Sequence, residues 1–180
     1  IFSSNNTGGT VNYSWINDNT SIGLPPSGSG DISPFLAVNS GATLQTATIT
    51  VTASYSNAGQ TCDSTETFLI SVSPSPVATI SGLNNYLVCE NDTPPFITFE
   101  GSNGTAPYTF TYQINSDPVQ QVISSGTSNT AIISVSTINS GTNVITLLSV
   151  SDSSTPTACT STNITLPNEA FVDVQEQGTI

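Results

Sequence analysis

The stretch GTAPYTFTYQIN, residues 104–115, alternates large apolar side chains with polar ones. The apolar set occupies every second position: Tyr108, Phe110, Tyr112 and Ile114. Because side chains along a β-strand point alternately to opposite faces, this spacing puts the whole apolar set on one face. It predicts a central strand whose aromatic face packs between two sheets, with threonines on the other face.

The same period of two recurs along the chain. TATITVTASY, residues 46–55, places Ile49, Val51, Ala53 and Tyr55 on one face. Similar runs are ETFLISV, PVATISG, PFITFEG, TAIISVS, NVITLLSV and EAFVDV, and clusters of Gly, Pro, Asn, Asp and Ser separate them. Half-buried strands have this pattern, and no segment keeps a helical period. The sequence therefore predicts an all-β chain of antiparallel sheets.

An internal repeat becomes visible when the chain is compared with itself at an offset of 97 residues. The matched pairs are Phe2 with Phe99, Tyr13 with Phe110, Trp15 with Tyr112, and Cys62 with Cys159. A period near 100 residues is typical of tandem β-sandwich domains. We therefore expect two copies of one sandwich module, with Trp15, Phe99, Phe110 and Tyr112 in their cores.

The repeat also divides the chain into domains. Residues 1–73 are expected to form an N-terminally truncated copy, and residues 77–175 a complete one. Pro74 and Pro76 restrict the backbone between them to extended conformations, which predicts a short, stiff linker at 74–76. Residues 176–180 would begin the next linker or module.

The three cysteines fit this division. At the same offset, the counterpart of Cys89 would precede residue 1, so Cys62 is expected to pair with a cysteine upstream of the sequence. Cys89 would then pair with Cys159. Disulfides indicate an oxidising, extracytoplasmic location. The alternative is three buried free thiols.

Charge excludes several classes of function. The chain has no Lys, Arg or His and a formal net charge of -12, so nucleic acid would be repelled. General acid-base catalysis and activated nucleophiles usually need His or Lys, and nothing in the sequence sets two acids across a cleft, so we expect no enzyme.

No apolar run reaches the roughly 18 residues of a membrane span, so no direct membrane insertion is expected.

Without basic side chains, each carboxylate must be hydrated, accept backbone N–H bonds, or bind a cation. Calcium suits hard oxygen ligands, and CENDTPP gathers Glu90 and Asp92 beside the expected disulfide. Asp173 and Glu176 could add ligands at a junction. The simpler alternative is that these acids only solvate loops, because no D-x-D-x-D ladder is present.

Two segments resemble a known family. YSWINDNTSIGLPPSGSGDISPFLAVNSG (13–41) with TATITVT (46–52), and GTAPYTFTYQIN, are similar to the PKD-like, immunoglobulin-like repeats of giant Bacteroidota surface proteins, such as gliding-motility adhesins of the SprB type. The resemblance implies tandem immunoglobulin-like β-sandwiches, export by the type IX secretion machinery, and display in an extracellular, outer-membrane-attached filament. It also implies that the partners are neighbouring modules of the same long chain and, for attachment, surface polysaccharide.

On this basis we expect a structural segment of an adhesin filament that serves surface attachment and gliding motility. One alternative is a carbohydrate-binding module, for which Tyr55 and Tyr86 are candidate stacking platforms. Another is a self-assembling filament or surface-layer subunit that receives a donated strand from a neighbour.

Overall fold

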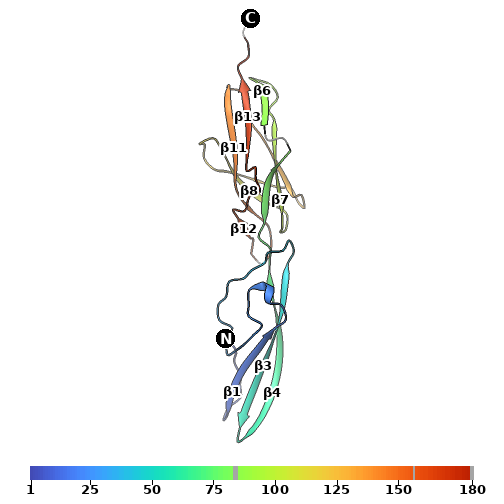
Figure 1. Cartoon of the computed structure of the whole chain (residues 1–180), viewed down its shortest axis with the longest axis vertical. Helices are drawn as coiled ribbons and strands as arrows, with labels where there is room; N and C mark the ends of the chain where they lie inside the picture. Colours follow the sequence, from blue (N-terminus) through green and yellow to red (C-terminus); the bar gives the residue numbers. More distant parts are fainter. Residues whose placement is uncertain (83–84, 156, 179–180) are drawn as a thin grey trace. The chain divides into compact units, whose positions relative to one another are not determined.

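A computed structural model describes residues 1–82, 85–155 and 157–178 (Figure 1). The regular structure of the described residues consists of β-strands and one single-turn 3-10 helix, which confirms the predicted all-β class. All pairings between strands are antiparallel except that of β6 with β13. Two compact units, Ile1–Pro74 and Ser75–Ile180, divide the chain inside the predicted 74–76 linker. The expected segment 176–180 is described only as far as residue 178.

Unit 1 contains one sheet in the order β2-β1-β3-β4. Its elements are β1 (Thr10–Asn17), η1 (Thr20–Ile22), β2 (Ser27–Ser29), β3 (Gln45–Asn57) and β4 (Gln60–Val72). β3 and β4 form a long hairpin, because Ala58 and Gly59 both take positive φ, as a two-residue turn between twisted strands requires. In place of a second sheet, η1 and loop residues such as Leu24 and Phe35 cover the apolar face.

Trp15 lies at the centre of the unit 1 core and is buried, as predicted. Its ring lies over Gly28, its partner on β2, so closely that a Cβ there would lie 2.3 Å from a ring carbon. Glycine at this position therefore makes room for the indole. Ile49 and Val51 of β3 complete the floor of this core, as their alternation predicted.

Unit 2 is a sandwich of two sheets. One sheet has the order β10-β7-β5 and the other β6-β13-β11-β8-β9, with β12 paired to β11. The strands are β5 (Val77–Ser81), β6 (Asn85–Cys89), β7 (Phe96–Ser102), β8 (Thr109–Ile114), β9 (Gln120–Ile123), β10 (Thr130–Ser134), β11 (Gly141–Ser151), β12 (Thr160–Ser161) and β13 (Glu169–Gln175). The alternating stretch quoted first forms β8, inside the larger sheet.

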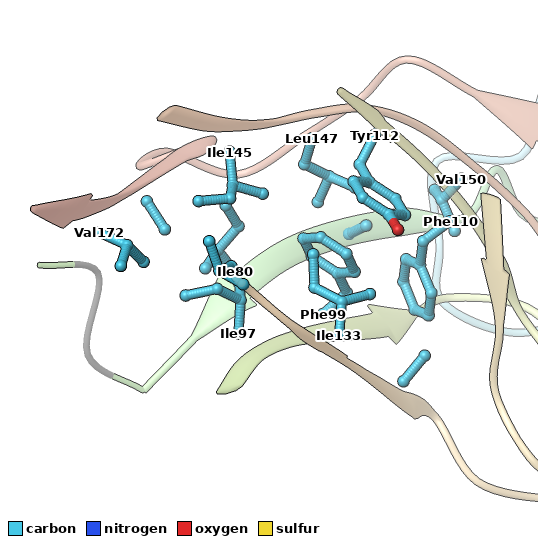
Figure 2. Close-up of a cluster of buried hydrophobic side chains, with 14 of the residues drawn as sticks. Ile80, Ile97, Phe99, Phe110, Tyr112, Ile133, Ile145, Leu147, Val150 and Val172 are labelled. Carbon is cyan, nitrogen blue, oxygen red and sulfur yellow. The ribbon is translucent and has the colours of Figure 1, made fainter. Parts of the chain in front are cut away.

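Aromatic side chains fill the space between these two sheets (Figure 2). Phe99 of β7 lies 5.8 Å from Phe110 and 5.3 Å from Tyr112, both on β8, measured between ring centroids. Phe99 and Phe110 are fully buried and Tyr112 nearly so, which confirms their predicted core positions. Aliphatic residues from both sheets surround them, so the core is closed on the face that the sequence predicted.

The sheet of unit 1 and the larger sheet of unit 2 share one pairing register. Phe110 pairs with Val150, and 97 residues earlier Tyr13 pairs with Ala53. The bulge in β11 between Leu147 and Ser149 changes the offset between β11 and β3 from 97 to 96 residues. On the far side of the bulge, the pair of Leu147 and Tyr112 in unit 2 corresponds to the pair of Val51 and Trp15 in unit 1.

The outer edge of the sheet corresponds as well. Val150 pairs with Ser161 as Ala53 pairs with Ser64, and Ile145 pairs with Ala170 as Ile49 pairs with Phe68. β4 of unit 1 is one continuous strand, whereas its counterpart in unit 2 is divided into β12 and β13. The register thus matches β1, β3 and β4 with β8, β11 and the β12–β13 pair.

Candidate functional site

The end of β11 carries a buried carboxylate, that of Asp152, which is 4% exposed. It accepts backbone N–H bonds from Thr105 at 3.0 Å and Cys159 at 2.7 Å, and a short hydrogen bond from the Ser154 hydroxyl. Gly104 packs against it so closely that a Cβ there would lie 2.6 Å from Oδ2. One side chain therefore ties two loops to the end of a core strand.

These contacts determine how Asp152 titrates. Burial by itself would raise the pKa of Asp152, but hydrogen bonds from the Ser154 hydroxyl and from three backbone N–H groups outweigh burial and lower the pKa. A carboxylate with a lowered pKa and fully engaged oxygens is a poor proton acceptor, so its chemistry is structural. Burial, and then the charge of Asp152, raise the pKa of the Cys159 thiol.

Nothing in the local sequence distinguishes Asp152 from the other acids. It follows a predicted strand within SVSDSSTP, a polar stretch typical of an exposed loop. The absence of basic residues does require that any buried carboxylate accept bonds from N–H or O–H donors. Which of the twelve acids is buried depends on how residues 103–107, Ser154 and Cys159 approach the end of β11, and this is a tertiary feature.

The acids predicted to bind calcium lie at the end of β6. Glu90 accepts the N–H of Ser140 at 2.8 Å, and Asp92 accepts the N–H of Cys89 at 3.2 Å. Asp173 accepts the Thr142 hydroxyl at 3.2 Å. Within the part of the chain that the structure describes, no three His, Cys, Asp or Glu side chains gather as metal ligands. Calcium binding by Glu90 and Asp92 stays a prediction.

The predicted bridge between Cys89 and Cys159 is wrong. None of the three cysteines, each within the described residues, is bonded to another. The pairing of Cys62 with a cysteine upstream of the sequence stays a prediction. Because β6 pairs in parallel with β13, Cys89 lies beside Gln175, at the end of the sheet where Gly141 begins β11. Cys159 donates its N–H to Asp152, just beyond the other end of β11. Along β11 these two ends are about 33 Å apart, whereas a disulfide needs Cα atoms within about 7 Å.

Thiol labelling of the native chain tests this correction. Cys62 and Cys89 are exposed and should react with a disulfide reagent at the rate of ordinary surface thiols, whereas half-buried Cys159 should react several-fold more slowly, because its raised pKa leaves less thiolate. Three labels per chain after unfolding without reductant is the expected total. Recovery of a peptide that joins Cys89 to Cys159 would contradict the described positions.

The hydroxyls of the two tyrosines proposed as sugar platforms are hydrogen-bonded within the protein. Tyr86 donates a hydrogen bond to the Phe96 carbonyl at 3.0 Å and packs on the unit 2 core. Tyr55 donates to the Thr7 carbonyl at 2.9 Å, and its ring covers Gly9. Both rings are held by the protein itself. Tyr55 and Tyr86 each also line an open pocket, so sugar binding at either ring stays a prediction.

Unit 1 carries a half-open groove of about 580 Å³ on the inner face of its sheet. We call it the unit 1 groove. Its lining includes Phe2, Tyr13, Tyr55, Asp63, Glu66 and Phe68. The hydroxyl of Tyr13 is buried there without a hydrogen-bond partner. The groove therefore combines an apolar floor with two carboxylates.

No helix among the described residues is long and apolar enough to cross a membrane. The described residues thus form a closed core in unit 2, a buried carboxylate (Asp152) that holds two loops, and an open groove in unit 1. Comparison of the sequence with protein-family models and with curated proteins finds no match.

Proposed function

We propose that the chain is a structural segment of a secreted adhesin filament on the cell surface, serving attachment and gliding. Its partners would be neighbouring modules of a longer chain and, during export, the type IX secretion machinery. The resemblance of residues 13–52 and 104–115 to the repeats of such adhesins is the basis for this location and for these partners.

The proposal of a structural role rests on where the aromatic and acidic side chains lie. The alternating aromatic residues of unit 2 are sealed between two sheets. Asp152 is the only acid buried among the described residues, and its oxygens are engaged in holding loops. Side chains used in this way maintain a fold and leave few groups free for chemistry.

Charge supports an extracellular structural role. With a net charge of -12 and no basic residue, parallel copies repel one another, which keeps a dense layer of filaments apart. Trypsin cuts after Lys and Arg, so the chain has no cleavage site for it. A surface filament benefits from both properties.

Antibody labelling of intact cells tests the location. An antibody against residues 1–180 should label cells that produce the protein without permeabilisation, and a cytoplasmic protein of the same cells serves as the negative control. A broad-specificity protease added to the intact cells should remove the signal. Labelling only after permeabilisation would contradict the proposal.

A further inference from the structure

An early strand of unit 2 and its last strand run side by side in the same direction. β6 pairs in parallel with β13, from Asn85 with Phe171 to Cys89 with Gln175 (Figure 1). We call this pairing the β6–β13 ladder. The chain enters the ladder at its Asn85 end, and after β13 it leaves at the Gln175 end. The two ends of unit 2 are therefore attached to opposite ends of one ladder.

This arrangement determines how tension acts on the ladder. Tension between the two ends of the chain pulls β6 toward Asn85 and β13 toward Gln175, along the strands and in opposite directions. All hydrogen bonds of the ladder are then loaded together, because each of them crosses between the two sliding strands. Strands that are pulled apart from one end lose their bonds one at a time, and each bond carries the whole load in turn. The parallel ladder thus resists tension with all its bonds at once.

The bonds of the ladder can be assigned to alternate residues of β6. Glu90, just beyond β6, donates its N–H to the carbonyl of the last residue of β13 at 2.9 Å. Cys89 donates its N–H away from β13, to the Asp92 carboxylate at 3.2 Å. Successive residues of a strand direct their N–H groups to opposite sides. The N–H of Val88 therefore points to β13, and that of Leu87 points away from it.

Contacts beyond β6 anchor this strand to the rest of unit 2. The Glu90 carboxylate accepts the N–H of Ser140 at 2.8 Å, and Asn91 donates its N–H to the Thr137 carbonyl at 2.9 Å. Thr137 in turn donates its hydroxyl to the Asp92 carbonyl at 2.6 Å. Tension on β6 must draw these residues away from the loop that precedes β11, so the contacts resist the same movement as the ladder.

β5 precedes β6 in the chain and meets the load first. It pairs with β7 in the smaller sheet, and it contacts the larger sheet side of unit 2 around Ala78, which forms a parallel bridge with Ile164. Load on the bonds with β7 reaches β13 only through side chains packed between the two sheets. The β6–β13 ladder, in contrast, joins the two loaded segments directly by backbone bonds.

We propose that the β6–β13 ladder is the force-bearing element of unit 2, so that tension between the ends of the chain loads it in shear and its rupture sets the unfolding force. The inference rests on the proposed function only in that a filament segment is pulled from end to end. Forced unfolding depends on the height of the unfolding barrier, and the melting temperature does not report that height.

Stretching single molecules in two directions tests this element. Cys89 is exposed and lies at the far end of β6, so it can hold a handle once Cys62 and Cys159 are replaced by Ser. Pulling between the two ends of the chain shears the ladder. Pulling between Cys89 and the C-terminal end opens the same ladder from Gln175, one bond at a time. The first direction should need at least about twofold more force to unfold unit 2.

Two matched variants assign the force to backbone bonds. Val88→Pro removes an N–H that points to β13, whereas Leu87→Pro removes one that points away. Val88→Pro should lower the end-to-end unfolding force of unit 2 by roughly a third, and Leu87→Pro should change it little. Val88→Ala keeps the N–H and shortens the same side chain, so it measures the part of the loss that packing causes.

Equal unfolding forces in the two directions would overturn the proposal. Equal forces for Val88→Pro and Leu87→Pro, or for Val88→Pro and Val88→Ala, would also contradict it. If Val88→Pro does not fold, the comparison of the two directions decides, because that comparison leaves the ladder unaltered. None of these results would bear on the surface location, which antibody labelling tests separately.

Discussion

Replacing Phe110 by alanine is expected to lower the free energy of unfolding of unit 2 by about 3–5 kcal/mol, the largest effect of any single change considered. Phe110 is fully buried and contacts the rings of both Phe99 and Tyr108. Removing its ring leaves a cavity between two sheets that cannot move together easily, because other aromatic side chains hold them apart. Urea denaturation followed by circular dichroism measures the loss.

The control for this prediction is Phe171→Ala. Phe171 lies on β13 with its ring directed away from the core, and it is 36% exposed. We expect a loss of about 1–2 kcal/mol, smaller than that of Phe110→Ala, because the ring is partly exposed and its removal leaves no enclosed cavity. The fluorescence of Trp15, the only tryptophan, reports on unit 1 and should show an unchanged transition in both variants. Equal losses in the two variants would contradict the described core.

Replacing Asp152 by alanine should lower the free energy of unfolding of unit 2 by about 3 kcal/mol, because several donors lose their acceptor together. Asp152→Asn keeps one acceptor oxygen and the shape of the side chain, so it should cost about half as much. Asp117→Ala is the matched control, because Asp117 is an exposed acid in a turn, and its effect should stay within about 0.5 kcal/mol.

The dependence of these losses on pH follows from the lowered pKa of Asp152. In the unfolded chain the carboxyl of Asp152 has a pKa of about 3.9, which lies above its pKa in the folded protein. The carboxylate therefore stabilises the fold fully above that pH, and its contribution is lost as the pH falls through the folded pKa. The difference in unfolding free energy between the native chain and Asp152→Asn should shrink on acidification from neutral pH. A difference that stays constant would contradict the stabilising hydrogen bonds described for the Asp152 carboxylate.

Strands and core residues could be read from the sequence because each depends on a local pattern. The alternation around Phe110 and around Ile49 assigns each side chain to a face, and burial of those faces follows from their apolar character. The offset of 97 residues likewise identified pairs that occupy corresponding places, such as Tyr13 and Phe110. In each case neighbouring residues carry enough information to decide the environment.

The contacts that the sequence did not show depend on how distant segments meet. The sequence predicts a bridge between Cys89 and Cys159 because both flank a complete module. The parallel pairing of β6 with β13 instead places Cys89 at the end of the sheet opposite to Cys159. Asp152 looks like any other loop acid until two loops bring their N–H groups to it. In unit 1, η1 and loops cover part of the sheet where two sandwiches were expected, and no short motif predicts this.

Stretching a single molecule of the chain between its two ends tests the central claim most directly, namely that it is a structural segment built of two separately folded units. Each unit has its own hydrophobic core, so we expect two distinct unfolding events. At about 3.4 Å per residue, these events should release about 250 Å for unit 1 and about 360 Å for unit 2, before subtracting the folded length of each. One gradual extension without separate force peaks would contradict the claim.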